Sequence, residues 1–290
     1  MKLTRGEKVF QVAAYVFLLC ILATVVFPIM NILAISLSGP KAVQLKQVSI
    51  WPVDFTLGAY ALILKSELFL HSLFNTIGIT IINTILAVFI TVCVAYVFST
   101  DFIGKTFVTY FFVITMYFGG GLIPSYIVNT NYLHMRDNFL ILILPGLVSM
   151  YYIIVVRSQI SNIPPSLFEA AEMDGASEAQ KLFSITIPSI TPTLAAVAMF
   201  FALSNWNTWF PVMLYDTKRN LWTLQYFLRA VVFEHIYTPA SIPTTASSIN
   251  IPPENFQNAV IVMVALPIVM IYPFVQKYFV KGILSGAVKE

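Results

Sequence analysis

Three clusters of amide, hydroxyl and aromatic side chains are the residues best suited to bind a ligand, and all lie in apolar stretches. An uncharged saccharide needs such groups, because amides and hydroxyls bond its hydroxyls while aromatic faces cover its C–H surfaces. Asn and Thr also join membrane helices, and Trp also marks the membrane interface, so a structural use stays open. The candidate substrate-pathway residues are Asn83, Tyr117, Asn205, Trp206, Asn207 and Trp209.

Gly104-Lys105-Thr106 resembles the end of a phosphate-binding loop. The P-loop pattern needs a glycine five residues before Gly104, and that position holds Ser99. The pattern also needs a preceding strand, whereas a long apolar run precedes Gly104. The sequence therefore predicts no nucleotide cofactor in this chain, and any ATP that drives the protein must be hydrolysed by a separate subunit.

Catalytic and metal-binding patterns do not stand out in the sequence. The histidines lie far apart, and no nucleophile–base pair or paired carboxylates occur, so we expect no catalytic residue and no metal site. An ion-coupled carrier ordinarily needs an ionisable side chain within a span. The long apolar windows hold no Asp, Glu, Lys or Arg, which argues against such a carrier. A sodium site built from backbone carbonyls stays open.

The composition indicates that lipid surrounds these residues. Hydrophobic residues make up 58% of the chain and charged residues only 10%, with a mean hydropathy of +0.83. A soluble domain carries roughly 25% charged residues, so this chain has too little charge to cover a surface that faces water. Its net charge of +3 gives no field suited to nucleic acid, which we exclude as a partner.

Six long apolar windows without a formal charge divide the 290 residues, and the shortest holds 19 residues. Roughly 20 apolar residues cross the hydrocarbon as a helix, and the windows lack the alternation of barrel strands. The sequence thus predicts an all-α membrane protein with a single transmembrane domain, 1–290. The expected spans are 9–37, 69–98, 106–128, 138–157, 191–215 and 256–279.

An even number of spans places both termini on one side of the membrane. Assigning that side to the cytoplasm gives it nine Lys and Arg residues against seven outside. This is a weak bias in the direction of the positive-inside rule. The assignment makes residues 158–190 a long cytoplasmic loop, here called the inner loop.

The inner loop carries the signals of two short helices separated by a turn. Ser166 and Glu169 have the spacing of a capping box, and so do Ser177 and Gln180. Gly175 is suited to end the first helix, because glycine tolerates the left-handed conformation found there. The first helix also carries two adjacent alanines, whose small side chains would let the groove of a partner approach closely.

These residues resemble a known signature. Glu169-Ala170-Ala171, then Gly175, then Ile187-Pro188 is similar to the EAA motif of permeases in binding-protein-dependent ABC importers. The resemblance extends over the whole chain. Within it, Gly119-Gly120-Gly121 and Trp206-Asn207-x-Trp209 resemble the permeases that take up complex glycans or polysaccharide fragments.

The resemblance implies a six-span permease, with both termini cytoplasmic, in the bacterial cytoplasmic membrane. Its implied partners are a second homologous permease, two ATPase subunits that use ATP and Mg²⁺, an extracellular solute-binding protein, an oligosaccharide and membrane lipid. The inner loop would contain the coupling helix that docks on an ATPase. The implied coupling residues are Leu167, Phe168, Glu169, Ala170, Ala171, Asp174 and Gly175.

Three other functions remain as alternatives at this stage. The permease could carry another small polar solute, although a phosphorylated one would favour cationic residues that the spans lack. A secondary sugar carrier would need no ATPase partner. A scaffold or sensor without transport ranks last, because the chain offers no dedicated output domain.

Overall fold

The computed structural model describes residues 4–235 and 251–287, apart from the side chains of residues 5, 272 and 274–287. Every regular element in those residues is a helix, which confirms the expected all-α class. The chain forms two compact units. One comprises residues 1–70 with 228–267, and the other comprises residues 71–227 with 268–290.

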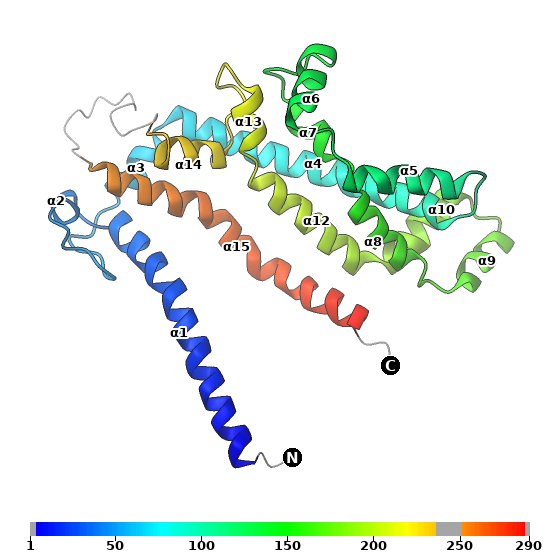
Figure 1. Ribbon diagram of the computed structural model, residues 1–290, viewed down its shortest axis with the longest axis horizontal. Coiled ribbons are helices and arrows are strands. Elements are labelled where there is room, and N and C mark those ends of the chain that lie inside the picture. The colour runs from blue at the N-terminus through cyan, green and yellow to red at the C-terminus, as the bar shows by residue number, and fades with distance from the viewer. Residues whose placement is uncertain (1–3, 236–250, 288–290) are drawn as a thin grey trace. The chain divides into compact units, whose positions relative to one another are not determined.

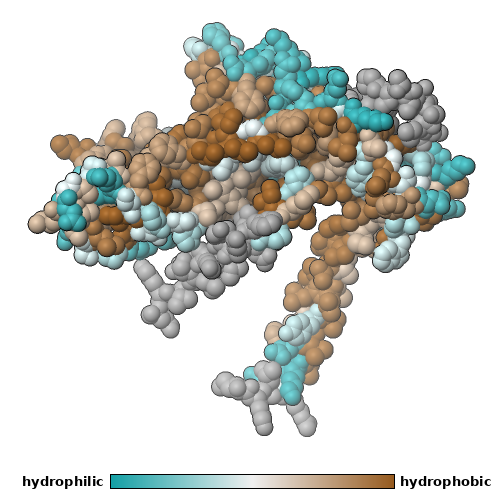
Figure 2. Space-filling view, turned by 180° about the vertical axis from the view of Figure 1, so that it is seen from behind, coloured by the Kyte–Doolittle hydropathy of each residue, from teal (hydrophilic) through white to brown (hydrophobic). Residues whose placement is uncertain are grey.

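The first unit contains the N-terminal helix and three shorter pieces (Figure 1). Its elements are α1 (Arg5–Ser36), α2 (Pro40–Gln44), α3 (Gly58–Leu64) and the first part of α15 (Pro253–Ala287). A capping box starts α1, because the Glu7 N–H donates to Thr4 Oγ1 at 3.4 Å and the Thr4 N–H donates to the Glu7 carboxylate at 2.6 Å. Apolar side chains cover most of the surface of α1 (Figure 2), as lipid contact requires.

Asn255 holds the end of α1. Its amide donates to the carbonyl oxygens of Ile35 at 2.9 Å and Ser38 at 2.8 Å, and only 1% of the residue is exposed. The last carbonyls of a helix lack partners within the helix. Asn255 therefore ties the start of α15 to the end of α1 and to the residue Ser38 that follows it.

The second unit is built on α4, with shorter helices packed along it (Figure 1). Its first elements are α4 (Glu67–Ser99), α5 (Lys105–Tyr117), α6 (Leu122–Ile127), the π-helix η1 (Val128–Tyr132), α7 (Leu140–Ile143), the 3₁₀-helix η2 (Leu144–Gly146) and α8 (Met150–Ile160). After the inner loop come α12 (Thr191–Trp206), α13 (Phe210–Tyr215) and the start of α14 (Leu224–Val232), whose residues from 228 on belong to the first unit.

Three of the apolar segments are bent rather than straight. The break between α5 and α6 is 108° and contains the glycine triplet that ends at Gly121, whose φ is +84°. The break between η2 and α8 is 47° and follows Pro145. The break before α12 is 83°, at Ile190, between Pro188 and Pro192. Glycine and proline cause these bends, since glycine permits unusual dihedrals and proline removes a helix donor.

The number of membrane crossings depends on these bends. Among the described residues, three helices are long and apolar enough to cross a membrane, and the number rises to six if each bent pair forms one span. The three continuous helices are α1, α4 and α15. Two bent segments overlap the expected spans 106–128 and 138–157, and the third, 178–206, overlaps only the first part of the expected span 191–215. The count of six stays a prediction.

The core of the second unit lies where α4, α8 and α12 meet. Ala87 and Ala95 on α4 are fully buried, and Ile153 of α8 and Phe201 of α12 join the same cluster. Small residues allow membrane helices to pack closely. This packing places the C-terminal end of α4 beside the inner loop.

Candidate coupling site and substrate pathway

The first helix of the inner loop is α9 (Pro165–Met173), and it begins without a side-chain cap. Its N-cap is Pro164, and Pro165 occupies the first helical position, where its fixed φ suits a helix. Ser166 is therefore already inside the helix. The predicted capping box of Ser166 and Glu169 is wrong, because the N-cap is Pro164, two residues before Ser166.

The end of α9 confirms the predicted glycine turn. Gly175 has a φ of +75°, and its N–H donates to the Glu172 carbonyl at 3.0 Å. The Ala176 N–H donates to the Ala171 carbonyl at 2.9 Å. This pair of bonds is the Schellman motif, which needs a left-handed residue at that position. Space alone would allow a larger residue, because a Cβ on Gly175 would meet nothing within 4 Å.

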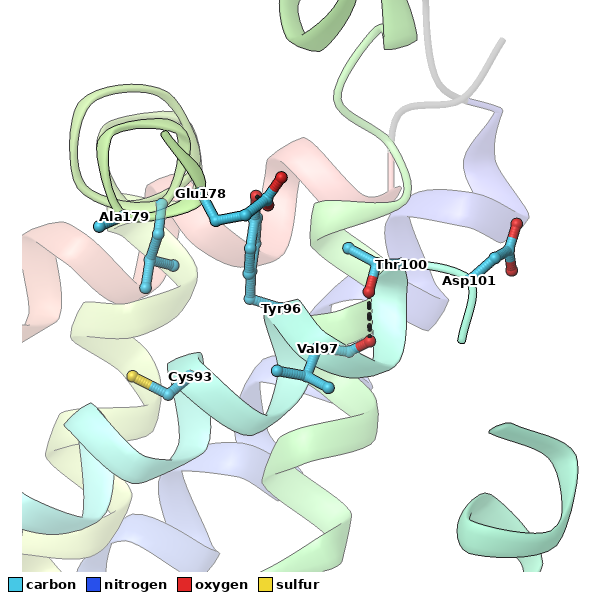
Figure 3. A pocket seen from close by; sticks show the side chains of 8 residues that line it. Cys93, Tyr96, Val97, Thr100, Asp101, Glu178 and Ala179 are labelled. Carbon is cyan, nitrogen blue, oxygen red and sulfur yellow. Dashed lines mark hydrogen bonds between the residues drawn. The ribbon is translucent and has the colours of Figure 1, made fainter. Parts of the chain in front are cut away.

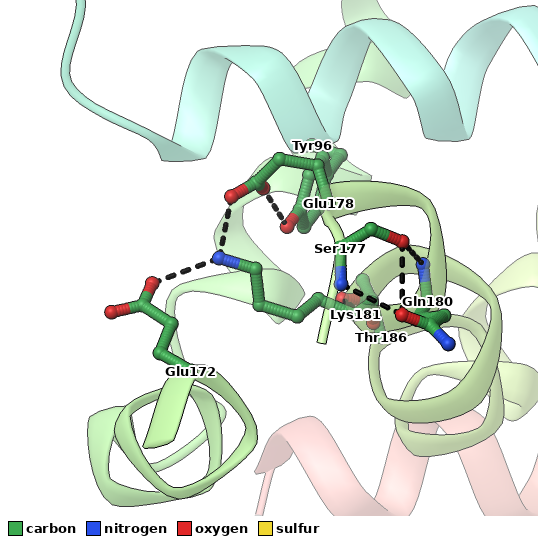
Figure 4. Close-up of polar contacts among 7 residues, drawn as sticks. All are labelled: Tyr96, Glu172, Ser177, Glu178, Gln180, Lys181 and Thr186. Carbon is green, nitrogen blue, oxygen red and sulfur yellow. Dashed lines mark hydrogen bonds and ion pairs between the residues drawn. The ribbon is translucent and has the colours of Figure 1, made fainter. Parts of the chain in front are cut away.

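The second arm of the inner loop begins with the other predicted capping box. The Gln180 N–H donates to Ser177 Oγ at 3.3 Å, and the Ser177 N–H donates to Gln180 Oε1 at 2.7 Å (Figure 4). The arm then runs through α10 (Glu178–Gln180), the π-helix η3 (Lys181–Thr186) and α11 (Ile187–Ser189). This capping box is confirmed.

The implied coupling residues differ in exposure. None of the residues of α9 is buried. Leu167, Glu169 and Ala170 are exposed, as are the turn residues Asp174 and Gly175. Two further members, Phe168 and Ala171, are half-buried. Phe168 packs against the core cluster of the second unit, so it anchors α9 while its neighbours face outward.

Lys181 lies at the centre of a polar network that joins the two arms of the inner loop and the end of α4 (Figure 4). Its Nζ lies 2.8 Å from Glu172 Oε1 of α9 and 2.5 Å from Glu178 Oε1 of α10. The Tyr96 hydroxyl, in the last turn of α4, donates to Glu178 Oε2 at 2.6 Å. Hydrogen bonds to Glu172 and Glu178 raise the pKa of the Lys181 ammonium. Hydrogen bonds from Lys181 and Tyr96 lower the pKa of the Glu178 carboxyl.

Two pockets flank this network. One has a volume of about 520 Å³ and lies between α9 and the end of α4, with Phe168, Glu169 and Glu172 in its wall. The other, of about 480 Å³, is lined by Cys93, Tyr96, Val97, Thr100, Asp101, Glu178, Ala179 and Leu182 (Figure 3). Tyr96, Thr100 and Glu178 belong to both pockets. The hydrogen bond between Tyr96 and Glu178, which links α4 to the second arm, therefore lies in the wall between the two pockets.

Two of the predicted substrate-pathway residues bind each other. Asn205 Nδ2 of α12 donates to Asn83 Oδ1 of α4 at 3.2 Å, and Asn83 Nδ2 donates to the Ile143 carbonyl at 3.0 Å. Asn83 is fully buried, and 8% of Asn205 is exposed. The structure thus uses both amides to join α4 to α12 and to α7.

The remaining pathway residues lie at helix ends. Trp206 is 7% exposed, and its Nε1 has no hydrogen-bond partner in the described part of the chain. Asn207 is exposed and accepts a hydrogen bond from Gln225 at 3.0 Å. Trp209 is half-buried, with its ring edge-on to that of Phe210. Tyr117 is exposed at the end of α5, next to the glycine break.

Comparisons with known proteins agree with this arrangement. No protein-family model matches the chain. The polygalacturonan/rhamnogalacturonan transport system permease protein YtcP of Bacillus subtilis (strain 168) is 32% identical over 98% of this chain and 99% of its own length. Protein LplC of the same organism is 33% identical over 99% of this chain and 97% of its own length.

A solved structure is also similar. A crystal structure of a bacterial ABC transporter involved in the import of the acidic polysaccharide alginate contains a chain that is 30% identical. The likeness covers 96% of this chain and 99% of that chain, with a TM-score of 0.89. Relatives of this kind are transport subunits rather than enzymes. The chain is a membrane protein and belongs to the permeases of ABC importers, in the carbohydrate-uptake branch.

Proposed function

We propose that this permease passes an oligosaccharide, delivered by an extracellular binding protein, across the bacterial cytoplasmic membrane. The names of its relatives support the substrate class, since they concern polygalacturonan, rhamnogalacturonan, arabinooligosaccharides and alginate. The amide and aromatic side chains at the end of α12 suit hydroxyl groups and sugar faces. A second permease and two ATPase subunits complete the transporter, and the ATPases use ATP and Mg²⁺.

The shape of α9 is the observation that carries the coupling role. It is a nine-residue helix with no buried residue, and it ends at a left-handed glycine around which space is free. Its outward side carries Leu167, Glu169 and Ala170, and the small side chain of Ala170 leaves room for a partner groove to reach the backbone. In our proposal an ATPase binds this side of α9, and closure of the ATPase pair moves the helix.

The proposed topology has six spans and both termini in the cytoplasm. In this topology α9 and the second arm of the inner loop face the cytoplasm. Labelling of single cysteines tests the assignment, after replacement of the native Cys20 and Cys93. A membrane-impermeant maleimide should label Ser177→Cys only from the inside and Gln47→Cys only from the outside, since both positions are exposed. Labelling of Ser177→Cys from outside would exclude the topology.

Transport in proteoliposomes tests the function itself. The complete transporter, with a labelled oligosaccharide and the binding protein, should accumulate sugar only when ATP and Mg²⁺ are present on the ATPase side. Uptake driven by an ion gradient without ATP would instead indicate a secondary carrier. Calorimetry of the binding protein with acidic oligosaccharides, neutral oligosaccharides and small polar solutes then identifies the substrate class, and binding of a small solute alone would overturn the oligosaccharide assignment.

A further inference from the structure

Lys181 is a nearly buried lysine with two carboxylate partners. Only 7% of its side chain is exposed, whereas the side chains of Glu172 and Glu178 are 62% and 67% exposed. Lysine is rarely buried so deeply unless it is paired. The two ion pairs, both within the inner loop, therefore account for the burial of the Lys181 side chain.

The network joins three helical segments in series. The ion pair of Lys181 with Glu172 links the second arm of the inner loop to α9. The hydrogen bond from Tyr96 to Glu178 links the same arm to α4. Lys181 and Glu178 are three residues apart in that arm and bind each other, so the series is continuous from α9 to α4.

Few other contacts fix α9 relative to α4. No residue of α9 is buried, and its described contact with the core cluster is made by Phe168, which is only half-buried. The turn at Gly175 is held by its two backbone hydrogen bonds, and a Cβ there would touch nothing, so no other part of the chain packs closely against it. The ion pair with Lys181 is thus a second side-chain attachment of α9, at Glu172 in its last turn, next to the turn at Gly175.

We propose that Lys181 is a positioning residue that transmits the displacement of α9 to the end of α4. The inference rests on the proposed function, in which an ATPase moves α9. When α9 moves, the pair with Glu172 carries the second arm with it, and the bond between Glu178 and Tyr96 carries α4. Without Lys181, α9 still docks, but less of its displacement reaches α4, because Phe168 is then its remaining side-chain attachment to the core cluster.

The test is the amount of sugar taken up per ATP hydrolysed by the reconstituted transporter. Lys181→Met should lower this ratio about tenfold, the size typical of lost coupling between sites. The KM for the loaded binding protein should not change, because Lys181 does not contact that protein in our proposal. Lys181→Arg should restore most of the ratio, since it keeps the positive charge.

Lys105→Met is the matched control. Lys105 also pairs with a carboxylate, that of Asp101, but this pair lies four residues apart on one segment and Asp101 is fully exposed. The control removes the same charge without breaking a link between segments, so it should leave the ratio unchanged. Glu172→Gln should lower the ratio as Lys181→Met does, and the double variant should be no worse than Lys181→Met alone.

If Lys181→Met does not assemble into the transporter, Tyr96→Phe tests the inference instead. It removes one hydroxyl and should lower the ratio about threefold. Normal coupling in Lys181→Met, or in Tyr96→Phe where the former fails to assemble, overturns the inference. If the unaltered transporter shows no ATP hydrolysis stimulated by the binding protein, the proposed function fails instead.

Discussion

The side-chain amide of Asn205 donates a hydrogen bond to Asn83 across 3.2 Å, although the two residues are 122 positions apart. Both residues are buried, and Asn83 also donates to the Ile143 carbonyl. In a low-dielectric interior, an amide without a partner is costly. The pair therefore fixes the position of α12 against α4, whatever else the two side chains do.

Replacement of Asn83 by alanine should destabilise the protein more than it weakens the binding of sugar. The change leaves the Asn205 amide and the Ile143 carbonyl without their partner, which costs about 1–2 kcal/mol. We expect a lower thermal unfolding midpoint in detergent and an unchanged KM for uptake. Asn131→Ala, at an exposed position, is the control. A raised KM with an unchanged midpoint would show that Asn83 contacts the substrate instead.

Thr76 of α4 caps the start of α14, so loss of its hydroxyl should weaken the start of that helix. Its buried hydroxyl accepts a hydrogen bond from the Leu224 N–H at 2.8 Å and donates to the Ser72 carbonyl at 2.8 Å. Thr76→Val keeps the shape but leaves the N–H at the start of α14 unpaired, a loss of about 1–3 kcal/mol. Amide hydrogen exchange at Leu224 should accelerate in Thr76→Val. Equal exchange in Thr76→Val and in the hydroxyl-bearing Thr76→Ser would contradict this role.

Gly175 and Gly104 form a matched pair for testing the coupling turn. Both have a positive φ, +75° and +85°, and neither would bring a Cβ within 4 Å of another atom. A side chain at either position costs about 1 kcal/mol of backbone strain. Gly175→Arg should abolish ATP hydrolysis stimulated by the binding protein, because the added bulk blocks the groove of the ATPase. Gly104→Arg should lower stability similarly yet retain stimulation. Loss of stimulation in both variants would refute a specific role for Gly175.

Asp137 should make one loop connection sensitive to acid. Its carboxylate accepts hydrogen bonds from the Thr217 N–H at 2.6 Å and the Thr217 hydroxyl at 2.7 Å, and these bonds lower its pKa from the ordinary 3.8. A lowered folded-state pKa contributes stability above the ordinary value, and this contribution is lost as pH falls below about 3.8. Asn tolerates the φ of +54° at this position, so Asp137→Asn removes the charge and one of the two acceptor oxygens without straining the backbone.

The difference in unfolding midpoint between the unaltered protein and Asp137→Asn measures this contribution. It should be positive at neutral pH and shrink as the carboxyl takes up a proton, below about pH 3.8. A difference that stays constant down to pH 3 would show that the charge of Asp137 does not matter.

The parts of the structure that local chemistry determines could be predicted from the sequence. Apolar windows without charge become helices, since only a helix satisfies its own backbone in lipid, and α1, α4 and α15 follow them. The turn at Gly175 and the capping box of Ser177 depend only on residues close in sequence, so the sequence pattern is sufficient to predict them. The start of α9 lies two residues before the predicted one, because Pro165 determines the first helical position more strongly than Ser166 can cap.

The polar network and the asparagine pair could not be predicted. Glu178 and Lys181 have the spacing of a helical ion pair, which is the only visible signal of the network. Glu172 lies on the far side of the glycine turn, and Tyr96 is 82 residues away from Glu178. Their meeting depends on how α4 packs against the inner loop, and one sequence does not contain that information. The bond between Asn83 and Asn205 depends on the same packing.

The break between α5 and α6 limits what can surround this part of the subunit. Residues 118–121 are not helical, and they are exposed in the isolated chain. Hydrocarbon offers nothing to which their peptide groups could bond, and each unmet group would cost several kcal/mol. Where this break lies at membrane depth, its flank must be sealed by neighbouring protein or wetted by an aqueous passage. At that depth an isolated subunit would leave these peptide groups unpaired, so Phe118 and the three glycines would mark the side that needs a partner other than lipid.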